Sequence, residues 1–203
     1  MLAFSEVEIA LATNLGVTPA NIAKFRARLK QLQRSGWPTG VNTGGKRPDY
    51  GAQQLLELAL VLELLECGVS PDRAVRLISA WWDSVRKAFL LAGDQADQEI
   101  MVGFFQTRFT GLSVRDGHKD IGDIDEGAMI FSITGAETKA ELSHLRQFLS
   151  APRYITINLS ALRRGLTHGL CVAGIESAFV WAQTEAWRFD LDNLGRSLDP
   201  RGN

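Results

Sequence analysis

Residues 11–34 decide the fold, and they read LATNLGVTPANIAKFRARLKQLQR. Glycine tolerates the backbone angles of a sharp turn, so Gly16 marks the place where two helices meet. The small Ala12, four residues earlier, lets these helices approach each other. Apolar side chains on both sides of the turn can fix the helix crossing: Leu11, Leu15, Val17, Ile22 and Phe25. The spacing predicts a helix-turn-helix.

Capping patterns predict where the two helices begin. Ser5 followed by Glu8 forms a Ser-x-x-Glu capping box, so the first helix should begin at Ser5 and end near Asn14. Thr18 followed by Pro19 is a cap with proline in the first helical position, which should start the second helix. That helix has an apolar stripe with a spacing of three or four residues: Ile22, Phe25, Leu29 and Leu32.

Cations crowd the second helix and the loop after it. Residues 21–48 contain seven Lys or Arg and no Asp or Glu, the electrostatic footprint expected where a polyanion binds. In a helix-turn-helix, the start of the second helix enters the major groove of DNA, where its side chains reach base edges or phosphates. The predicted DNA-binding residues are Thr18, Asn21, Lys24, Arg26, Arg28, Gln31, Lys46 and Arg47.

A short hairpin is predicted after the second helix, which should end at Trp37-Pro38. Residues 41–47 contain a glycine turn between short extended runs, the pattern of a wing. Lys46 and Arg47 at its edge would hold the phosphate backbone and orient the helix without reading sequence. Two alternatives remain open: the helix pair could be a tight hairpin within a core, and residues 41–47 could be a solvated loop.

Two further helices are expected after the hairpin. Residues 52–67 are apolar on nearly every side and predict the central core helix. Ser70-Pro71 should start a fourth helix, by the same cap and proline pattern. Its apolar arc is too wide to be buried on one partner, and the adjacent Trp81 and Trp82 point about 100° apart. One tryptophan could therefore meet a second body, either a sister chain or the C-terminal half.

Two motifs connect these elements to a known family. Residues 45–50, GKRPDY, match a Gly-x-Arg-x-Tyr segment that closes a wing, and residues 66–70, ECGVS, contain a Gly-x-Ser turn between two helices. With the order of the helices, they resemble the winged-helix domain of MerR-type transcription regulators over residues 4 to about 80. The resemblance implies a DNA-binding module. The chain differs at residues 24–30, KFRARLK, which replace an aromatic-rich helix end, and it lacks the family's long dimerising coiled coil.

The charge changes sign along the chain. Residues 1–93 have 11 Lys or Arg against 8 Asp or Glu, whereas residues 94–203 have 11 against 15. A polar stretch at residues 92–99 lies between, so we expect a DNA-binding domain at 1–92 and a second domain at 100–203. The predicted fold is mainly α, with the second domain a small α+β unit. Its strands should lie in residues 101–110, 128–134 and 153–159, and its helices in 136–149, in a short stretch capped by Ser160, and in 175–189.

Groups that could carry chemistry are sparse in the second part. His168 and Cys171 lack a second pair to complete a tetrahedral metal site. Arg163-Arg164 could bind an anion, although ordinary surface cations fit as well. No phosphate-cradling glycine loop, nucleophile elbow or metalloprotease His pair occurs, so we expect no catalytic residue, metal site or cofactor. One acidic loop could hold a hard cation but fits a solvated turn better: Asp120, Asp123, Asp125 and Glu126.

These patterns predict a sequence-specific transcription regulator whose partner is double-stranded DNA and which acts as a homodimer. The C-terminal domain would oligomerise, sense a ligand or contact another protein. The chain has no apolar run of about 20 residues and no secretory signal, so we expect a cytoplasmic protein without a membrane partner.

Two other functions remain open. The first is a protein-interaction adaptor on a helix-turn-helix scaffold without DNA contact, working through the fourth helix and the Trp-bearing C-terminal helix. The second is an enzyme targeted to nucleic acid whose acidic loop holds a metal.

Overall fold

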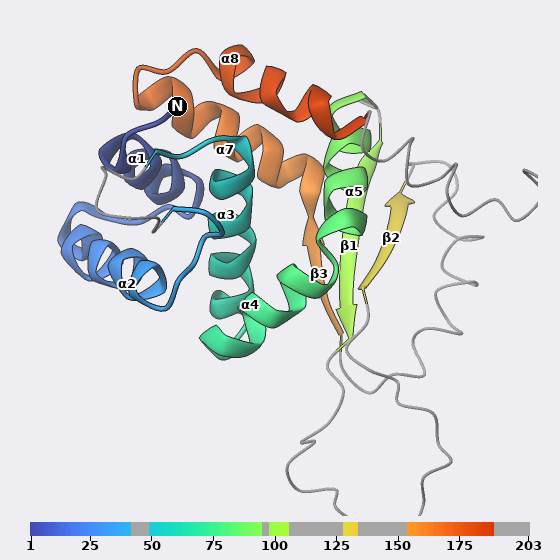
Figure 1. Cartoon of the computed structure of the whole chain (residues 1–203), viewed down its shortest axis with the longest axis horizontal. Helices are drawn as coiled ribbons and strands as arrows, with labels where there is room; N and C mark the ends of the chain where they lie inside the picture. Colours follow the sequence, from blue (N-terminus) through green and yellow to red (C-terminus); the bar gives the residue numbers. More distant parts are fainter. Residues whose placement is uncertain (42–48, 95–97, 106–127, 134–153, 189–203) are drawn as a thin grey trace, which may run out of the picture.

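A computed structural model describes residues 1–41, 49–94, 98–105, 128–133 and 154–188, and its mainly helical character confirms that part of the predicted fold class (Figure 1). The α-helices are α1 (Phe4–Asn14), α2 (Ile22–Arg34), α3 (Ala52–Glu66), α4 (Pro71–Ala80), α5 (Trp82–Asp94), α7 (Leu159–Val172) and α8 (Ser177–Trp181). The 3-10 helices are η1 (Pro19–Asn21) and η2 (Ala182–Thr184), and the strands are β1 (Glu99–Phe105), β2 (Ala128–Ile133) and β3 (Tyr154–Asn158).

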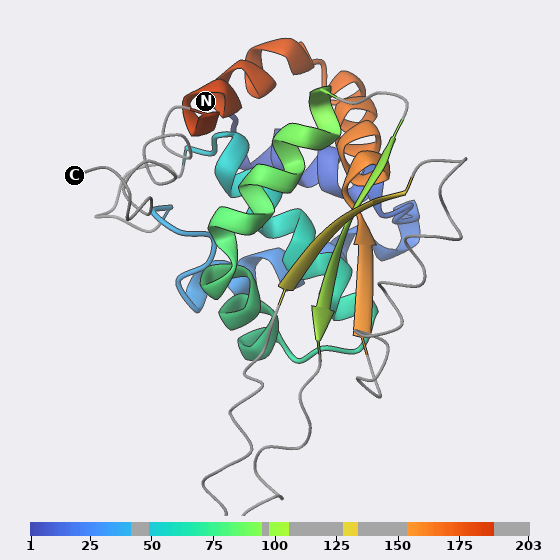
Figure 2. The ribbon, with the colours of Figure 1, turned by 90° about the vertical axis from the view of Figure 1, so that its right-hand side faces the viewer.

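The three strands form an antiparallel sheet in the order β2-β1-β3. In the central strand, alternate residues are buried because successive side chains point to opposite faces of a sheet: Ile100, Val102 and Phe104. The helices of the described part lie together on one side of this sheet, as Figure 2 shows. The strands predicted at 128–134 and 153–159 are confirmed within one or two residues. Strand β1 overlaps the region predicted at 101–110 and begins two residues before it.

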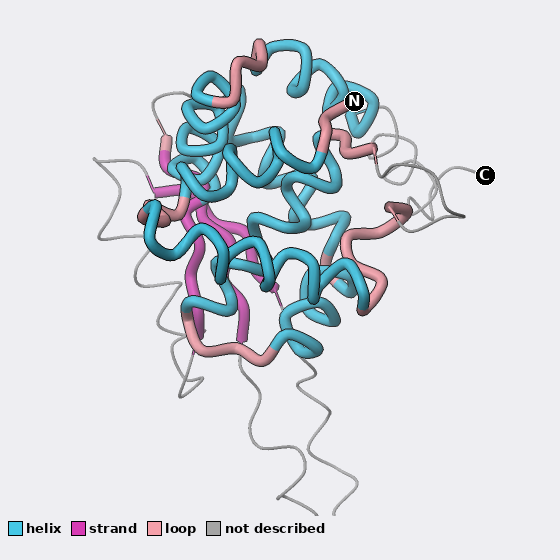
Figure 3. The backbone as a smooth tube through the Cα atoms, turned by 90° about the vertical axis from the view of Figure 1, so that its left-hand side faces the viewer, coloured by secondary structure: helices cyan, strands magenta, loops and turns pink. Residues whose placement is uncertain are grey.

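Helix α3 runs through the middle of the helices in Figure 1, and Figure 3 shows the helices from the side away from the sheet. Its leucines are buried on several sides, which confirms the predicted central core helix, and it ends at Glu66, one residue before the predicted end. A buried carboxylate, Glu57, lies on the same helix and accepts hydrogen bonds from the backbone N–H of Thr39 at 2.8 Å and from Gln53 Nε2 at 2.8 Å. Burial raises the pKa of Glu57, while these hydrogen bonds lower it.

The prediction of one long fourth helix is wrong, because the helix is interrupted at Trp81 and continues as α5. The break divides the wide apolar arc between two directions: α4 packs on α3, and α5 packs on α7 and the sheet. Trp82 then meets Trp187 edge to face, with 5.9 Å between the ring centroids. The second body predicted for this tryptophan pair is therefore the C-terminal part of the same chain.

Two predicted helix starts are also wrong. Helix α1 begins at Phe4 rather than Ser5, because the carboxylate of Glu6 accepts the backbone N–H of Ala3 at 2.6 Å and caps the helix there. Helix α7 is capped by Asn158, whose side-chain oxygen accepts the N–H of Ala161 at 2.8 Å. The predicted cap, Ser160, instead accepts the N–H of Ile100 at 3.0 Å and joins α7 to β1.

Helices α1 and α7 approach each other closely at two glycines of α7. A β-carbon on Gly169 would lie 2.9 Å from the Cα atom of Ala10 and closer still to its carbonyl oxygen. A β-carbon on Gly165 would overlap the side-chain oxygen of Asn14. We call this contact the glycine seam. Residues from both predicted domains belong to one hydrophobic core.

Several predictions lie outside the described residues or receive only a partial answer. The wing at 41–47, the helix at 136–149 and the acidic loop all fall mainly or wholly on residues that are not described. The predicted boundary at 92–99 includes residues 95–97, which are also outside, and the two-domain division stays a prediction. No helix in the described residues is long and apolar enough to cross a membrane.

Candidate nucleic-acid interface

The turn between α1 and α2 depends on Gly16, whose φ angle is +63°. This is the left-handed region in which glycine is not strained. The turn is closed by a hydrogen bond from the N–H of Val17 to the carbonyl oxygen of Ala12, at 2.8 Å. Gly16 and Ala12 are the residues that the sequence pattern predicted at the turn and at the close approach of the two helices.

Thr18 and Asn21 lie at the start of the second helical segment and bond to each other. The side-chain amide of Asn21 donates to Thr18 Oγ1 at 3.2 Å, and both residues are exposed. Thr18-Pro19 starts the 3-10 turn η1, and the α-helix proper begins at Ile22, three residues later. Thr18 and Asn21, two of the eight predicted DNA-binding residues, are therefore close together at the N-terminal end of α2.

Helix α2 has one buried face, formed by Phe25, Leu29 and Leu32, as predicted. The rest of the helix is largely exposed, and it contains five Lys or Arg and no acidic residue. In Figure 1 the helix lies on the outside of the bundle, at the end away from the sheet.

Arg26 is held at one margin of the exposed surface of α2. Its Nε donates to both carboxylate oxygens of Glu8 on α1, at 2.8 and 3.0 Å. The Glu8 side chain is 5 % exposed, whereas that of Arg26 is 53 % exposed. The hydrogen bond to Glu8 raises the pKa of Arg26. The prediction that Glu8 caps the first helix is wrong, because its partner, Arg26, lies 18 residues away on another helix.

Arg28 is held at the opposite margin. Its Nη1 lies 3.4 Å from Glu66 Oε1 at the end of α3, and both side chains are more than half exposed. Such an exposed pair contributes little to stability, but it draws Arg28 towards α3. The two margins of α2 are thus connected to α1 and α3 by ion pairs.

Between these margins lies a surface that we call the basic face, formed by Lys24, Lys30 and Arg34. All three side chains are exposed, and none forms an ion pair with another residue of the described part of the chain. Gln31 also lies on this side of the helix. Sequence reasoning included Lys24 and Gln31 but missed Lys30 and Arg34. The position of these two cations opposite the apolar stripe could have identified them.

Lys46 and Arg47, the remaining predicted DNA-binding residues, lie outside the described residues. The structure does connect the N-terminus to the segment that follows them, since Leu2 and Tyr50 exchange two backbone hydrogen bonds of 2.7 and 3.1 Å.

The other candidate groups do not form a metal site in the part of the chain that is described, where no cluster of three or more potential ligands occurs. His168 and Cys171 are both exposed on α7. Arg164 pairs with Glu99 at 2.9 Å, and Arg163 is turned inward between α5 and α8. No protein-family model matches this sequence, and no curated protein matches it.

Proposed function

We propose that the protein is a transcription regulator that binds double-stranded DNA through the basic face of α2. The observation that supports the proposal is the division of cations on this helix. Arg26 and Arg28 are paired at the margins, while Lys24, Lys30 and Arg34 lie between them without an acidic partner in the described residues. A row of exposed, unpaired cations favours a polyanion, because binding releases the counterions condensed on the phosphates.

The two ion pairs also favour recognition by a helix of fixed orientation. Arg26 connects α2 to α1, and Arg28 connects it to α3, so the helix is restrained on both sides. A restrained helix loses less entropy on binding than a mobile basic tail does. In the proposed complex, Thr18 and Asn21 lie near the groove, Lys24, Lys30 and Arg34 contact phosphates or base edges, and a homodimer doubles these contacts.

The adaptor alternative has less support. Its expected working surfaces were the apolar arc of the fourth helix and the Trp-bearing C-terminal helix. In the structure, Trp82 packs on Trp187, and Phe89 contacts Trp181 with 5.4 Å between the ring centroids. Phe89, Trp181 and Trp187 are buried by these contacts, although Phe179 on α8 is exposed.

The proposal is tested by titrating the full chain into a fluorescent, random-sequence DNA duplex at several salt concentrations. The double variant Lys24→Ala/Arg34→Ala should bind more weakly than the unmodified protein. Its plot of log affinity against log salt should lose up to about 2 units of slope, since each lost phosphate contact removes about 0.9. Its urea unfolding curve should be unchanged, because exposed cations without partners contribute little to stability.

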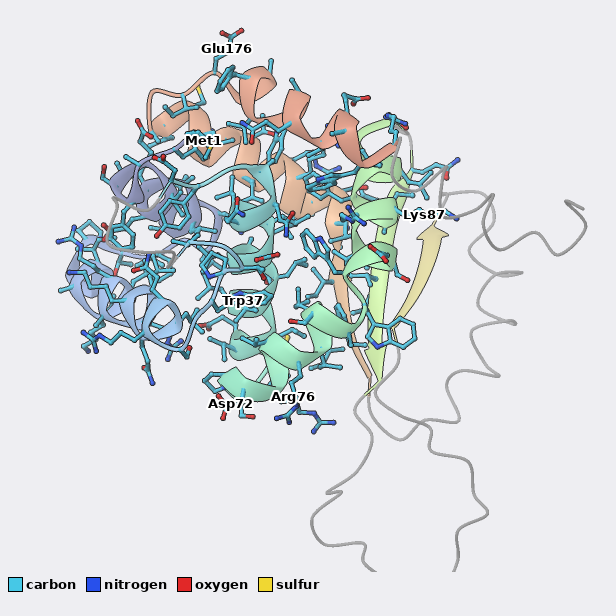
Figure 4. The ribbon with its side chains drawn as sticks, in the orientation of Figure 1. Met1, Trp37, Asp72, Arg76, Lys87 and Glu176 are labelled. Carbon is cyan, nitrogen blue, oxygen red and sulfur yellow. The ribbon has the colours of Figure 1, made fainter. Side chains whose placement is uncertain are left out.

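The matched control is Arg76→Ala/Lys87→Ala, which removes two exposed cations on α4 and α5 (Figure 4). This control should keep the affinity and most of the salt dependence. An equal loss in both double variants would show a response to net charge rather than to the basic face. An unchanged affinity in Lys24→Ala/Arg34→Ala would contradict the proposal.

A further inference from the structure

A cavity of about 650 Å³ lies beside α7, between the end of α5 and the segment that leads into α8. This volume is in the range of small-molecule sites. Helix α7 lines it from Ser160 to Cys171, and Gly93 and Glu176 complete the wall from the two neighbouring segments. Glu176 is labelled at the upper edge of the molecule in Figure 4.

The cavity and the glycine seam use opposite sides of α7. At about 100° per residue, Arg163, Thr167 and Cys171 fall on one side of the helix, and Gly165 and Gly169 fall on the other. The first set lines the cavity, and the second set contacts α1. The cavity is therefore a feature separate from the packing of α1 and α2.

Arg163 is the most enclosed cation in the wall of the cavity. Its Nη1 donates to the carbonyl oxygen of Phe89 at 3.1 Å. Its guanidinium lies over two aromatic rings, 5.0 Å from the centroid of Phe89 and 5.6 Å from that of Trp181. Gly93 leaves room for it, since a β-carbon there would overlap Arg163 Nη1. One hydrogen bond and two ring contacts thus position this guanidinium at the wall of the cavity.

The positive charge of Arg163 has no carboxylate in direct contact within the described residues. Two carboxylates, Asp94 and Glu185, act on it through space, and each of them also accepts a hydrogen bond from Arg188, at 2.8 Å and 2.7 Å. Burial lowers the pKa of Arg163 because desolvation disfavours the charged form, yet a guanidinium remains charged in proteins. A partly desolvated cation of this kind attracts an anion.

The rest of the lining defines the ligand further. Arg164 follows Arg163 on α7 and pairs with Glu99, while Glu176 is the acidic side chain among the described lining residues. Ala92 and Ile175 give the cavity an apolar part. The two arginines suit a carboxylate or a phosphate, and the apolar residues suit a hydrocarbon or aromatic group next to it.

We propose that this cavity binds a small organic anion, with its carboxylate or phosphate on Arg163 and Arg164 and its apolar part against Ala92 and Ile175. The proposal does not depend on DNA binding. The two possible anionic groups have the same recognition chemistry, and the probes below distinguish them.

The test uses the two exposed cysteines of the chain. Cys171 lines the cavity, whereas Cys67 follows α3 and is not among the cavity-lining residues. The full protein is labelled with iodoacetamide, and mass spectrometry gives the rate at each cysteine. Benzoate and phenyl phosphate serve as anionic probes, benzyl alcohol as the uncharged probe, and sodium chloride as the control for ionic strength.

We expect an anionic probe to slow the labelling of Cys171 and to leave Cys67 unchanged. Fragments of this size bind with a Kd of roughly 1 mM, so about 10 mM of probe should slow Cys171 about tenfold. Protection by benzoate alone or by phenyl phosphate alone would identify the preferred anionic group and support the proposal. Protection by benzyl alcohol at the same strength would overturn it, as would the absence of protection by both anions.

Two variants connect the protection to the arginines. Arg163→Met keeps much of the packing on the aromatic rings and should abolish protection, while Arg164→Ala, at an exposed position, should weaken it. If Arg163→Met does not fold, as judged by circular dichroism, Arg164→Ala and the probe series on the unmodified protein decide. Full protection in a folded Arg163→Met variant would contradict the proposed role of Arg163.

Discussion

Helices α2 and α7 both carry arginines, but the structure holds these arginines in different ways. On α2, Arg26 and Arg28 are fixed at the margins by acids of other helices, and the cations between them are exposed. On α7, Arg163 lies over two aromatic rings beside a cavity, and the opposite side of the helix is closed against α1 by glycines.

The comparison suggests a rule: the exposure of a cation decides whether it suits an extended polyanion or a small anion. The exposed row on α2 can follow an extended polyanion, and the attraction will weaken as salt rises. The guanidinium of Arg163 on α7 is half-buried at the wall of the cavity, and salt screens a partly buried charge less than an exposed one. The two proposals therefore predict different salt dependence as well as different ligands.

The largest effect should come from breaking the seam that holds α7. Gly169→Val places a side chain against the backbone of Ala10, where no side-chain movement can make room. We expect the free energy of unfolding to fall by about 3 kcal/mol, the upper part of the range for overpacking. Urea denaturation followed by circular dichroism measures the change.

Gly165→Val is the matched control for the seam, because the atoms nearest to its β-carbon belong to the side chain of Asn14. That side chain can rotate away, so the control should cost clearly less than Gly169→Val. Equal stability losses would mean that the close backbone approach at Gly169 is not the limiting contact.

An intermediate effect should separate the two margins of α2. Arg26→Ala leaves the buried carboxylate of Glu8 without its partner, and an unpaired buried acceptor of this kind costs roughly 1 to 2 kcal/mol. Arg28→Ala breaks an exposed pair with Glu66 and should change the urea midpoint very little. If both variants unfold at the same urea concentration, the difference in burial between Glu8 and Glu66 has no energetic consequence.

The smallest effect concerns the exposed acids around α7. The hydrogen bond from Asn158, followed by that from Arg164, lowers the pKa of Glu99, and Arg188 lowers the pKa of Asp94. Since both folded pKa values lie below the usual 4.5 and 3.8, their stabilisation is complete above those values and is lost as pH falls through the folded values.

Unfolding curves between about pH 5 and pH 2 check this, with Asp94→Asn/Glu99→Gln as the comparison. The advantage of the unmodified protein over this variant should be under about 1 kcal/mol because both pairs are exposed, and it should shrink as the pH falls. A stability advantage that grows towards low pH would show that the pKa values of Asp94 and Glu99 are not lowered in the folded protein.

The sequence predicted the structure best where a feature depends only on residues close together in one segment. The apolar stripe of α2, the buried α3 and the turn at Gly16 follow from local spacing, and all three are confirmed. Contacts between distant segments were not accessible in this way. Glu8 matched a local capping motif, but its carboxylate instead accepts hydrogen bonds from Arg26, which lies on a different helix.

The glycine seam shows the same limit. The short helix predicted after Ser160 included Leu162 and Leu166 and so ran through Gly165. Because glycine is a poor helix former, Gly169 gave no reason to extend it to the observed end at Val172. Both glycines are tolerated because the lost helix propensity is offset by the close contact with α1, and that contact depends on the tertiary fold. The cavity beside α7 could not be predicted either, since it needs α5, α7 and the segment before α8 together.

Gln183 has a consequence for handling the protein. Its side-chain oxygen accepts the N–H of Ala52 at 3.1 Å, so a residue near the end of the described chain secures the first turn of the central helix 131 positions earlier. A fragment truncated after residue 92 would lack this bond, the aromatic cover of Trp82 and the whole of α7. The lysines of α2 should therefore be studied in the full chain, because an N-terminal fragment would expose apolar side chains that the C-terminal part buries.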